Sequence, residues 1–137
     1  MGVGERRPEA ADQALVILLD TNAVIWLDQN HRRARPLART ATPLAISPAT
    51  ILELQFLVEV GRIRFPQNGL AALAADDRWT VDEPPALDWF ARAAEESWTR
   101  DPFDRLIVAH ARLRRCRLAT GDETLLDRLR SAERLEL

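Results

Sequence analysis

The chain has 137 residues, enough for one domain with a buried core, and 47% of them are hydrophobic while 29% are charged. No apolar run approaches the length needed to cross a bilayer, and the first residues lack the pattern of a signal peptide. All nineteen basic residues are arginine, which excludes lysine-dependent mechanisms, and the net charge of −2 leaves any RNA binding to local arginine patches.

Residues 1–13 are polar and charged, and we expect a disordered leader there, followed by a single folded domain over residues 14–137. The first clear element is the apolar run at residues 15–19, which is short enough to be a buried parallel strand. Residues 23–27 then indicate the start of a helix. Residues 31–39 carry four arginines and predict a loop with a short helix.

A second strand is predicted at residues 43–46, directly before a well-marked helix start. Ser47 is a good N-cap and Pro48 suits the first helical position, while Gly61 is a natural C-terminal stop. The alternation continues with helices at 69–75, 87–97, 102–114 and 123–130, and with strands at 79–81 and 117–119. Alternating strands and helices favour an α/β domain with a mostly parallel sheet.

Two aspartates stand directly after predicted strands. Asp20 follows the strand at residues 15–19, and Asp122 follows the strand at 117–119. Because open parallel α/β sheets bind ligands at the carboxyl ends of their strands, we expect both side chains at one sheet edge. Taken singly, each aspartate is better explained as a turn or helix-cap residue.

Helical periodicity places Glu53. At about 100° per residue, Glu53 falls in the middle of an apolar stripe that we expect to face the protein. The stripe consists of Ala49, Phe56, Leu57 and Val60, and the solvent-facing side roughly opposite it consists of Gln55, Glu59 and Arg62. A buried carboxylate is costly without a partner, so Glu53 needs either a salt bridge to an arginine or a bound cation. The residues alone leave both alternatives open.

Asp104 repeats this pattern on the helix that begins at Pro102. It shares a face with the apolar residues Ile107 and Val108. Asp101 stands three residues earlier, and the two acids resemble a capping pair stabilised by the helix dipole. We therefore assign Asp101 mainly to the N-cap, whereas Asp104 can serve both a cap and a binding site.

Four acids would repel one another if they met at this sheet edge: Asp20, Glu53, Asp104 and Asp122. Two carboxylates about 4 Å apart repel by roughly 4 kcal/mol at an effective dielectric of about 20. Several such pairs would rival the whole stability of a domain, so the cluster must bind a cation or take up protons. Oxygen-only ligands select Mg²⁺ or Mn²⁺ over zinc, and a carboxylate-held ion of this kind suits phosphodiester hydrolysis.

The other reactive residue types are interpreted as structural. Cys116 is the only cysteine, so no internal disulfide can form and a reducing, cytoplasmic setting fits best. We expect Cys116 to be a small buried hydrophobe beside a strand. His110 falls on a predicted apolar face and is expected in the core or an interface. No Ser-His-Asp or Cys-His arrangement stands out.

Four segments, in this order, resemble the signature regions of PIN-domain nucleases, and most closely the VapC-type toxins of bacterial toxin–antitoxin pairs. They are LLDTNAVIW, SPATILELQFL, RDPFDRLIVAHA and LATGDETLL, and the resemblance spans about residues 15–126. The DPFDR-like sequence is typical of a subset of these toxins. The resemblance implies a three-layer α/β/α sandwich, one or two Mg²⁺ or Mn²⁺ ions and endonucleolytic cleavage of RNA. It also implies a homodimer and a tight complex with a cognate antitoxin protein.

The resemblance further implies which residues act. The family's catalytic and metal-binding acids match Asp20, Glu53, Asp104 and Asp122. Asp101 matches the extra acid of the DPFDR-like subset, and the polar positions that orient acids or waters match Thr21, Asn22 and Thr120. Hydrolysis in the family proceeds by in-line attack of a metal-activated water, without a covalent intermediate.

Contacts to RNA must come from arginine, because the chain has no lysine. Arginine can grip a phosphate with two parallel hydrogen bonds. The candidates near the expected site are Arg32, Arg33, Arg35 and Arg39. A solvated loop, or a surface that pairs with acidic residues of an antitoxin, explains this cluster equally well.

Three alternative functions compete with that of a toxin. A phosphatase of the haloacid dehalogenase type also has an aspartate after its first strand, but it requires a second acid where this chain has Asn22, and normally a lysine. A PIN-like fold can instead be a catalytically silent scaffold that binds RNA or protein. A PIN nuclease that processes RNA without being a toxin is the third alternative, and an antitoxin encoded next door would separate it from a toxin.

Overall fold

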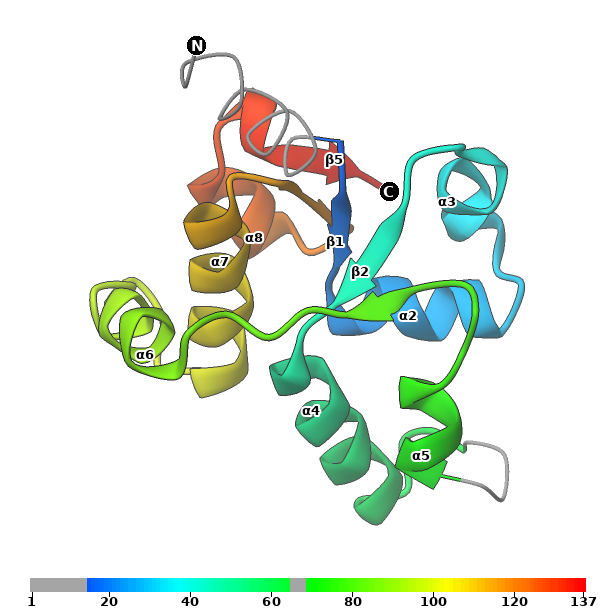
Figure 1. The fold of residues 1–137 in the computed structure, drawn as a ribbon. Helices are drawn as coiled ribbons and strands as arrows, with labels where there is room; N and C mark the ends of the chain where they lie inside the picture. Colours follow the sequence, from blue (N-terminus) through cyan, green and yellow to red (C-terminus); the bar gives the residue numbers. More distant parts are fainter. Residues whose placement is uncertain (1–14, 65–68) are drawn as a thin grey trace, which may run out of the picture.

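The computed structural model describes residues 15–64 and 69–137, and a five-stranded sheet forms its centre (Figure 1). The strands are β1 (Ile17–Leu19), β2 (Leu44–Ile46), β3 (Thr80–Val81), β4 (Arg117–Thr120) and β5 (Arg134–Glu136). All of them pair in parallel, in the order β3-β2-β1-β4-β5. The chain extends the sheet from β1 first to one side and then to the other. The carboxyl end of β1 is therefore a topological switch point, where sheets of this kind bind ligands.

Helices cover both faces of this sheet and produce three layers (Figure 1). The layer on one face contains α6 (Ala86–Ala94), α7 (Pro102–Arg114) and α8 (Glu123–Arg128). The remaining helices are α2 (Thr21–Asp28), α3 (Arg35–Arg39), α4 (Pro48–Glu59) and α5 (Gly69–Ala74), with short 3-10 turns at Arg32–Ala34 and Ser131–Glu133. Among them, α4 contacts α7 as well as α2 and α5, so it links the two helical layers. The three-layer α/β/α architecture is confirmed.

Alternate residues of each central strand contribute to two separate cores. Leu18 of β1 belongs to the core beneath α6 and α7, which includes Trp89. Its neighbours Ile17 and Leu19 belong to the core on the opposite face, which includes Leu54 of α4. Because both faces of the sheet are covered, the strand is apolar without interruption, as the sequence indicates.

The sheet has one strand more than the sequence predicts. β5 follows the last helix and pairs with β4, and the Leu137 N–H donates to the Thr120 carbonyl at 3.0 Å. β5 has only three residues, and Arg134 and Glu136 at its ends are charged. Residues 134–137 alternate between charged and apolar, which is a strand pattern of only the minimum length, and the elements predicted from the sequence do not include it.

The predicted buried face of α4 is partly wrong. Phe56 is 48% exposed and Val60 is 67% exposed, although both were assigned to the stripe facing the protein. The buried residues of the helix are Ala49, Thr50 and Leu54. The expected stripe is displaced because α4 packs against α7 on one side and against α2 and α5 on the other, so its C-terminal turns leave the core.

Two residues predicted to be structural are buried, as expected. Cys116 is a free thiol in the core beneath α7, where burial raises its pKa to about 11. His110 is completely buried, and its Nε2 lies 2.7 Å from Oδ2 of Asp82. Both side chains are therefore buried within the fold, and neither lies among the predicted site residues.

The predicted leader at residues 1–13 lies outside the described residues. The rest of the predicted domain carries all the elements named above. Within residues 15–64 and 69–137, no helix combines the length and the apolar character needed to span a membrane.

Candidate active site

Asp20 is fixed at the carboxyl end of β1 by several hydrogen bonds. Its N–H donates to the Ala119 carbonyl of β4 at 3.1 Å, which extends the sheet by one residue. Its Oδ1 accepts the Ala23 N–H at 2.8 Å, so the side chain caps α2 as predicted. The nearby Thr120 side chain favours the charged form of this carboxylate and lowers its pKa, against the effect of burial. Asp20 is therefore buried, with its orientation set by two strands and a helix start.

Asp122 occupies the equivalent place after β4. Its N–H donates to Thr120 Oγ1 at 3.0 Å, and its Oδ1 accepts N–H groups of the first turn of α8. The turn that leads to it contains Gly121, beside which there is little space for a side chain. A Cβ atom on Gly121 would lie 2.5 Å from Arg33 Nη2 and 2.7 Å from Cη2 of Trp26, so one of these side chains would have to shift.

Glu53 is held by a neutral partner. The Thr21 hydroxyl at the start of α2 donates to Glu53 Oε1, and Thr21 Oγ1 lies 3.4 Å from Thr50 Oγ1. Within the described part of the chain, no arginine pairs with Glu53, so the salt bridge that the sequence left open is not formed there. Burial raises the pKa of Glu53, against the effect of the Thr21 hydrogen bond, and the nearby Asp101 charge raises it further.

Asp101 and Asp104 come from the first turn of α7. Asp101 is the N-cap, and its Oδ1 accepts the N–H groups of Phe103 at 2.8 Å and Asp104 at 3.2 Å. The carboxylate of Asp104 is half-buried above Ile107, which is 1% exposed, so the predicted face of α7 is confirmed. Capping by Asp101 leaves the Asp104 side chain available for a different role.

All four predicted acids line one pocket of about 190 Å³, which we call the acid pocket. Its lining residues are Asp20, Thr21, Asn22, Glu53, Leu57, Arg62, Asp101, Asp104, Ile107, Asp122 and Leu125. The pocket lies where the sheet order reverses, between the first turns of α2, α7 and α8 and the middle of α4. Of the predicted supporting residues, Thr120 alone is absent from the lining; it accepts the Asp122 N–H and lowers the pKa of Asp20.

The electrostatics of the acid pocket show like charges that are poorly neutralised. Burial raises the pKa of Asp20 to about 6, and the nearby charges of Asp122 and Glu53 add to the increase. Burial also raises the pKa of Asp104 to about 7, with contributions from the negative charges of Asp101 and the other acids. Asp20, Glu53 and Asp104 therefore hold protons more tightly than isolated carboxyl groups do.

The donor chemistry of the acid pocket fits a hard divalent cation. Carboxylate oxygens predominate, with a hydroxyl and an amide beside them and no histidine or cysteine in the lining, which suits Mg²⁺ or Mn²⁺. Among residues 15–64 and 69–137, no three histidine, cysteine, aspartate or glutamate side chains are arranged to hold a metal ion as they lie. Mg²⁺ usually keeps several waters and needs only one or two carboxylates, which this set of acids can supply.

The arginines of the pocket differ from those named from the sequence. Arg33 stacks 4.2 Å from the ring centroid of Trp26 and donates to the Leu137 carbonyl at 3.0 Å. The other three sequence candidates are exposed: Arg32, Arg35 and Arg39. None of the four lines the acid pocket, and RNA contact by them stays a prediction. Arg62 does line it, although helical periodicity assigns Arg62 to the face opposite Glu53. The signal that identifies Arg62 is Gly61, which ends the helix before it.

Comparisons with known proteins agree with this arrangement. The PIN domain family is matched over residues 17–131, which include every acid of the pocket. The fold is similar to a chain of a toxin–antitoxin complex from Klebsiella pneumoniae, with a TM-score of 0.63 and 21% identity over 88% of this chain and 99% of that one. It is also similar to a chain of VapBC2 from Rickettsia felis, solved with a promoter DNA fragment. Here the TM-score is 0.64 and the identity 18%, and the match covers 89% of this chain and 98% of that one. No curated protein sequence matches the chain significantly.

Proposed function

The chain belongs to the PIN domain family, and from that premise we propose that it is a metal-dependent endoribonuclease, the toxin of a toxin–antitoxin pair. PIN domains are generally nucleases. The observation that carries the proposal is the convergence of the four predicted acids, from four separate elements, on one pocket: Asp20, Glu53, Asp104 and Asp122. A merely structural role does not account for this convergence, because the repulsion among these acids costs stability.

The four acids are the residues that would hold one or two Mg²⁺ ions, with Mn²⁺ as the alternative. When bound, such an ion supplies Lewis-acid polarisation of the scissile phosphate and a bound water of lowered pKa. We propose hydrolysis of the RNA phosphodiester by in-line attack of water, without a covalent intermediate.

The protein's own side chains would orient this reaction. The Ala23 N–H orients the Asp20 carboxylate, and the Thr21 hydroxyl does the same for Glu53. Asn22 brings an exposed amide to the rim of the acid pocket, where it can hydrogen-bond RNA. Asp101 holds the first turn of α7 and so sets the position of Asp104.

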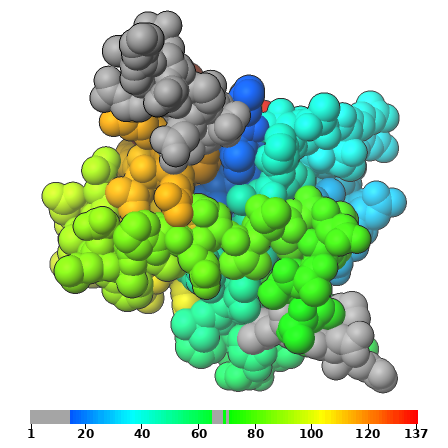
Figure 2. Space-filling model, viewed as in Figure 1, coloured from blue at the N-terminus to red at the C-terminus, as the bar shows by residue number. Residues whose placement is uncertain are grey.

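A protein partner is supported by apolar side chains at the surface. On α4 these are Leu52 and Phe56, with Val60 directly after the helix, and on α6 they are Leu87 and Phe90. Both helices reach the surface on the same face of the molecule (Figure 2). Clustered apolar side chains at a surface mark interaction sites. We propose that a cognate antitoxin and a second copy of the chain, in a homodimer, cover them in the cytoplasm, a setting compatible with the free thiol of Cys116.

The test is cleavage of single-stranded and structured RNA by the purified chain with Mg²⁺ or Mn²⁺, compared with EDTA. Asp20→Asn is expected to reduce cleavage to the uncatalysed background, since it removes a ligand charge without changing the shape. Asp127→Asn is the matched control, because Asp127 is exposed and lies outside the acid pocket. It is expected to cleave at the wild-type rate.

A wild type that binds no Mn²⁺ in calorimetric titration and cleaves none of the RNAs would refute the nuclease and favour the scaffold. A second experiment addresses the toxin. Expression of the chain is expected to arrest growth, and expression of Asp20→Asn is not. Rescue by the product of an adjacent gene would identify the antitoxin, whereas normal growth with active enzyme would favour an RNA-processing nuclease.

A further inference from the structure

Arg62 is the one basic residue among the described residues that line the acid pocket. Five carboxylates share that lining: Asp20, Glu53, Asp101, Asp104 and Asp122. Arg62 follows the end of α4 and its side chain is exposed to solvent. A positive group is therefore placed at the edge of a strongly negative pocket.

The backbone of Arg62 is fixed by the way α4 ends. Gly61 has φ of 77°, a left-handed conformation that favours glycine, and its N–H donates to the Val58 carbonyl at 3.0 Å. The Arg62 N–H donates to the Leu57 carbonyl at 2.9 Å. These two bonds form a Schellman motif, which reverses the chain back against the last turn of the helix. Leu57 itself lines the acid pocket, one turn after Glu53, so the cap holds Arg62 beside the pocket.

Despite these neighbours, Arg62 is not used as a counter-ion. Within residues 15–64 and 69–137, no carboxylate oxygen lies within 4.0 Å of its guanidinium nitrogens. Arg112, by contrast, is paired with Glu96 at 2.8 Å. An arginine whose task is to neutralise the pocket would be expected to pair with one of its five acids. The N–H donors of Arg62 are instead available to a ligand.

We propose that Arg62 binds a phosphate of the RNA at the rim of the acid pocket and so positions the chain for cleavage. This assignment rests on the proposed ribonuclease function. A phosphodiester that approaches five carboxylates is repelled, and a cation on the rim offsets part of that repulsion. The planar guanidinium also offers two parallel N–H donors to two phosphate oxygens, which fixes the orientation of the phosphate.

The experiment measures RNA binding separately from cleavage. A fluorescent single-stranded oligoribonucleotide is titrated with the Asp20→Asn chain in Mg²⁺, at several NaCl concentrations, and anisotropy gives Kd. Adding Arg62→Ala is expected to weaken binding by about tenfold, the loss of one charge-assisted contact. It should also reduce the slope of log K against log salt by about 0.7, the contribution of one phosphate contact to a single strand.

Two further variants separate the contact from general effects. Arg64→Ala is the matched control, because Arg64 is exposed on the same segment but does not line the pocket, and it is expected to leave affinity and slope close to wild type. Arg62→Lys keeps the charge but loses the two parallel N–H donors of the guanidinium. The salt dependence of binding should therefore be retained, with a Kd between those of wild type and Arg62→Ala. In the active chain, Arg62→Ala is expected to raise KM about tenfold, with a smaller change in kcat.

The outcomes also separate this proposal from the proposed function. If the wild type cleaves RNA and Arg62→Ala binds it with unchanged affinity and slope, the assignment of Arg62 is overturned while the nuclease stands. If RNA binding depends on Arg62 but no RNA is cleaved with either metal, the contact is supported and the nuclease fails. If Arg64→Ala loses as much RNA affinity as Arg62→Ala does, both residues act only through their surface charge. That result would overturn the specific contact of Arg62.

Discussion

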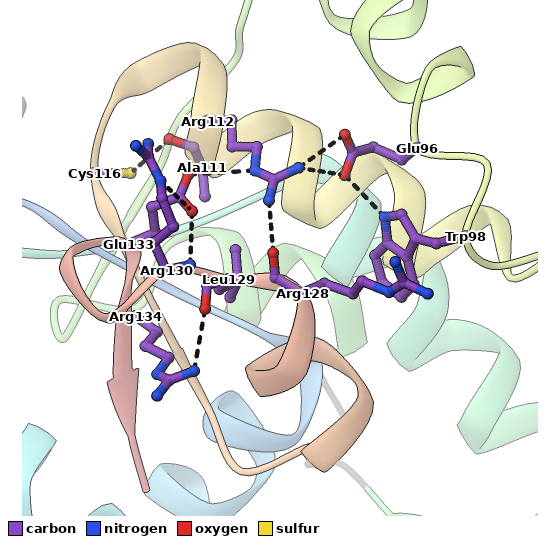
Figure 3. Close-up of polar contacts among 10 residues, drawn as sticks. All are labelled: Glu96, Trp98, Ala111, Arg112, Cys116, Arg128, Leu129, Arg130, Glu133 and Arg134. Carbon is purple, nitrogen blue, oxygen red and sulfur yellow. Dashed lines mark hydrogen bonds and ion pairs between the residues drawn. The ribbon is translucent and has the colours of Figure 1, made fainter.

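The two ends of α7 differ in how their charged side chains are paired. At the N-terminal end, Asp104 lies in the acid pocket among four other carboxylates, with no ion pair in the described part of the chain. At the C-terminal end, Arg112 donates from Nη1 to Glu96 at 2.8 and 3.1 Å and from Nε to Glu133 at 3.3 Å (Figure 3). Its Nη2 donates to the Arg128 carbonyl at 2.8 Å.

This difference shows at which end of α7 unpaired charges lower the stability of the protein. The paired end ties the segment after α6, the end of α8 and the turn before β5 to one arginine. The unpaired end is confined to the pocket, where repulsion among acids favours the arrival of a cation. We infer that the Arg112 network supports the helices that carry Asp104 and Asp122, while the acid pocket weakens the fold locally.

The largest expected effect comes from breaking the paired end. Arg112→Ala is expected to lower the free energy of unfolding by about 3 kcal/mol, because it leaves Glu96, which is 6% exposed, without its cation. Urea denaturation followed by circular dichroism measures this. Arg130→Ala is the control, since its side chain is 85% exposed although it also pairs with Glu133, and no measurable change is expected. Equal losses of unfolding free energy in Arg112→Ala and Arg130→Ala would show that the ion pairs of Arg112 add no special stability.

The next effect comes from neutralising the unpaired end. Mn²⁺ at about one hundred times its Kd is expected to raise the free energy of unfolding by about 2.7 kcal/mol, because it binds the folded acid pocket alone. Thermal denaturation with Mn²⁺, and with NaCl of equal ionic strength, separates binding from screening. In Asp20→Asn the stabilisation should be much smaller. The same stabilisation in both proteins would place the ion elsewhere.

The pH dependence should expose the cost of the acid pocket. The pKa of Asp104 is about 7 in the folded protein against a usual value of 3.8, so the folded state binds more protons between these values. In EDTA, the stability contributed by this group is therefore present below about pH 4 and lost as the pH rises through 7. Asp104→Asn should stabilise the protein by about 1.5 kcal/mol at pH 8, a figure discounted for solvent screening of a half-buried group.

Chemical denaturation of Asp104→Asn and wild type at pH 4.5 and pH 8 measures this difference. The benefit of the substitution should be small at the lower pH, since Asp104 is then already protonated in the folded protein. Destabilisation at pH 8, or an equal benefit at both values, would show that ionising the half-buried Asp104 does not carry this cost.

The smallest effect concerns the turn that leads into Asp122. Gly121→Ala is expected to cost about 1 kcal/mol, because the new Cβ meets Trp26 and Arg33 and one of them must shift. In an Arg33→Ala background, Gly121→Ala should lower the free energy of unfolding by less than it does in the wild type, since Arg33 Nη2 is the nearest atom. Urea denaturation of the single and double variants measures this. Full additivity of the two substitutions would contradict the predicted contact.

The acids were predictable because two independent sequence rules locate them. Asp20 and Asp122 are placed by the strands they follow, and Asp104 by the apolar face of its helix. For Glu53 the periodicity gave the right inward side but the wrong neighbours, because tertiary packing determines which turns of α4 are buried. Their convergence required the strand order, which local patterns do not contain. That step came from the family resemblance.

Helical periodicity assigns Arg62 to the wrong side of α4 for a definite physical reason. The helical angle was extended past Gly61, although the left-handed glycine ends the helix and reverses the chain. A rule that stops the helical projection at the C-terminal glycine would have removed Arg62 from the opposite face. It would not have located the acid pocket beside it, because that contact depends on how α4 packs against α7.

The burial of Cys116 has a consequence for the redox chemistry of the protein. The chain has only this thiol, and its pKa of about 11 leaves only about one molecule in ten thousand as thiolate at pH 7. Disulfide exchange and oxidation by peroxide both proceed through the thiolate, so the folded protein should resist both. Exposure to oxidants should therefore neither cross-link two copies of the folded chain nor add oxygen to its sulfur.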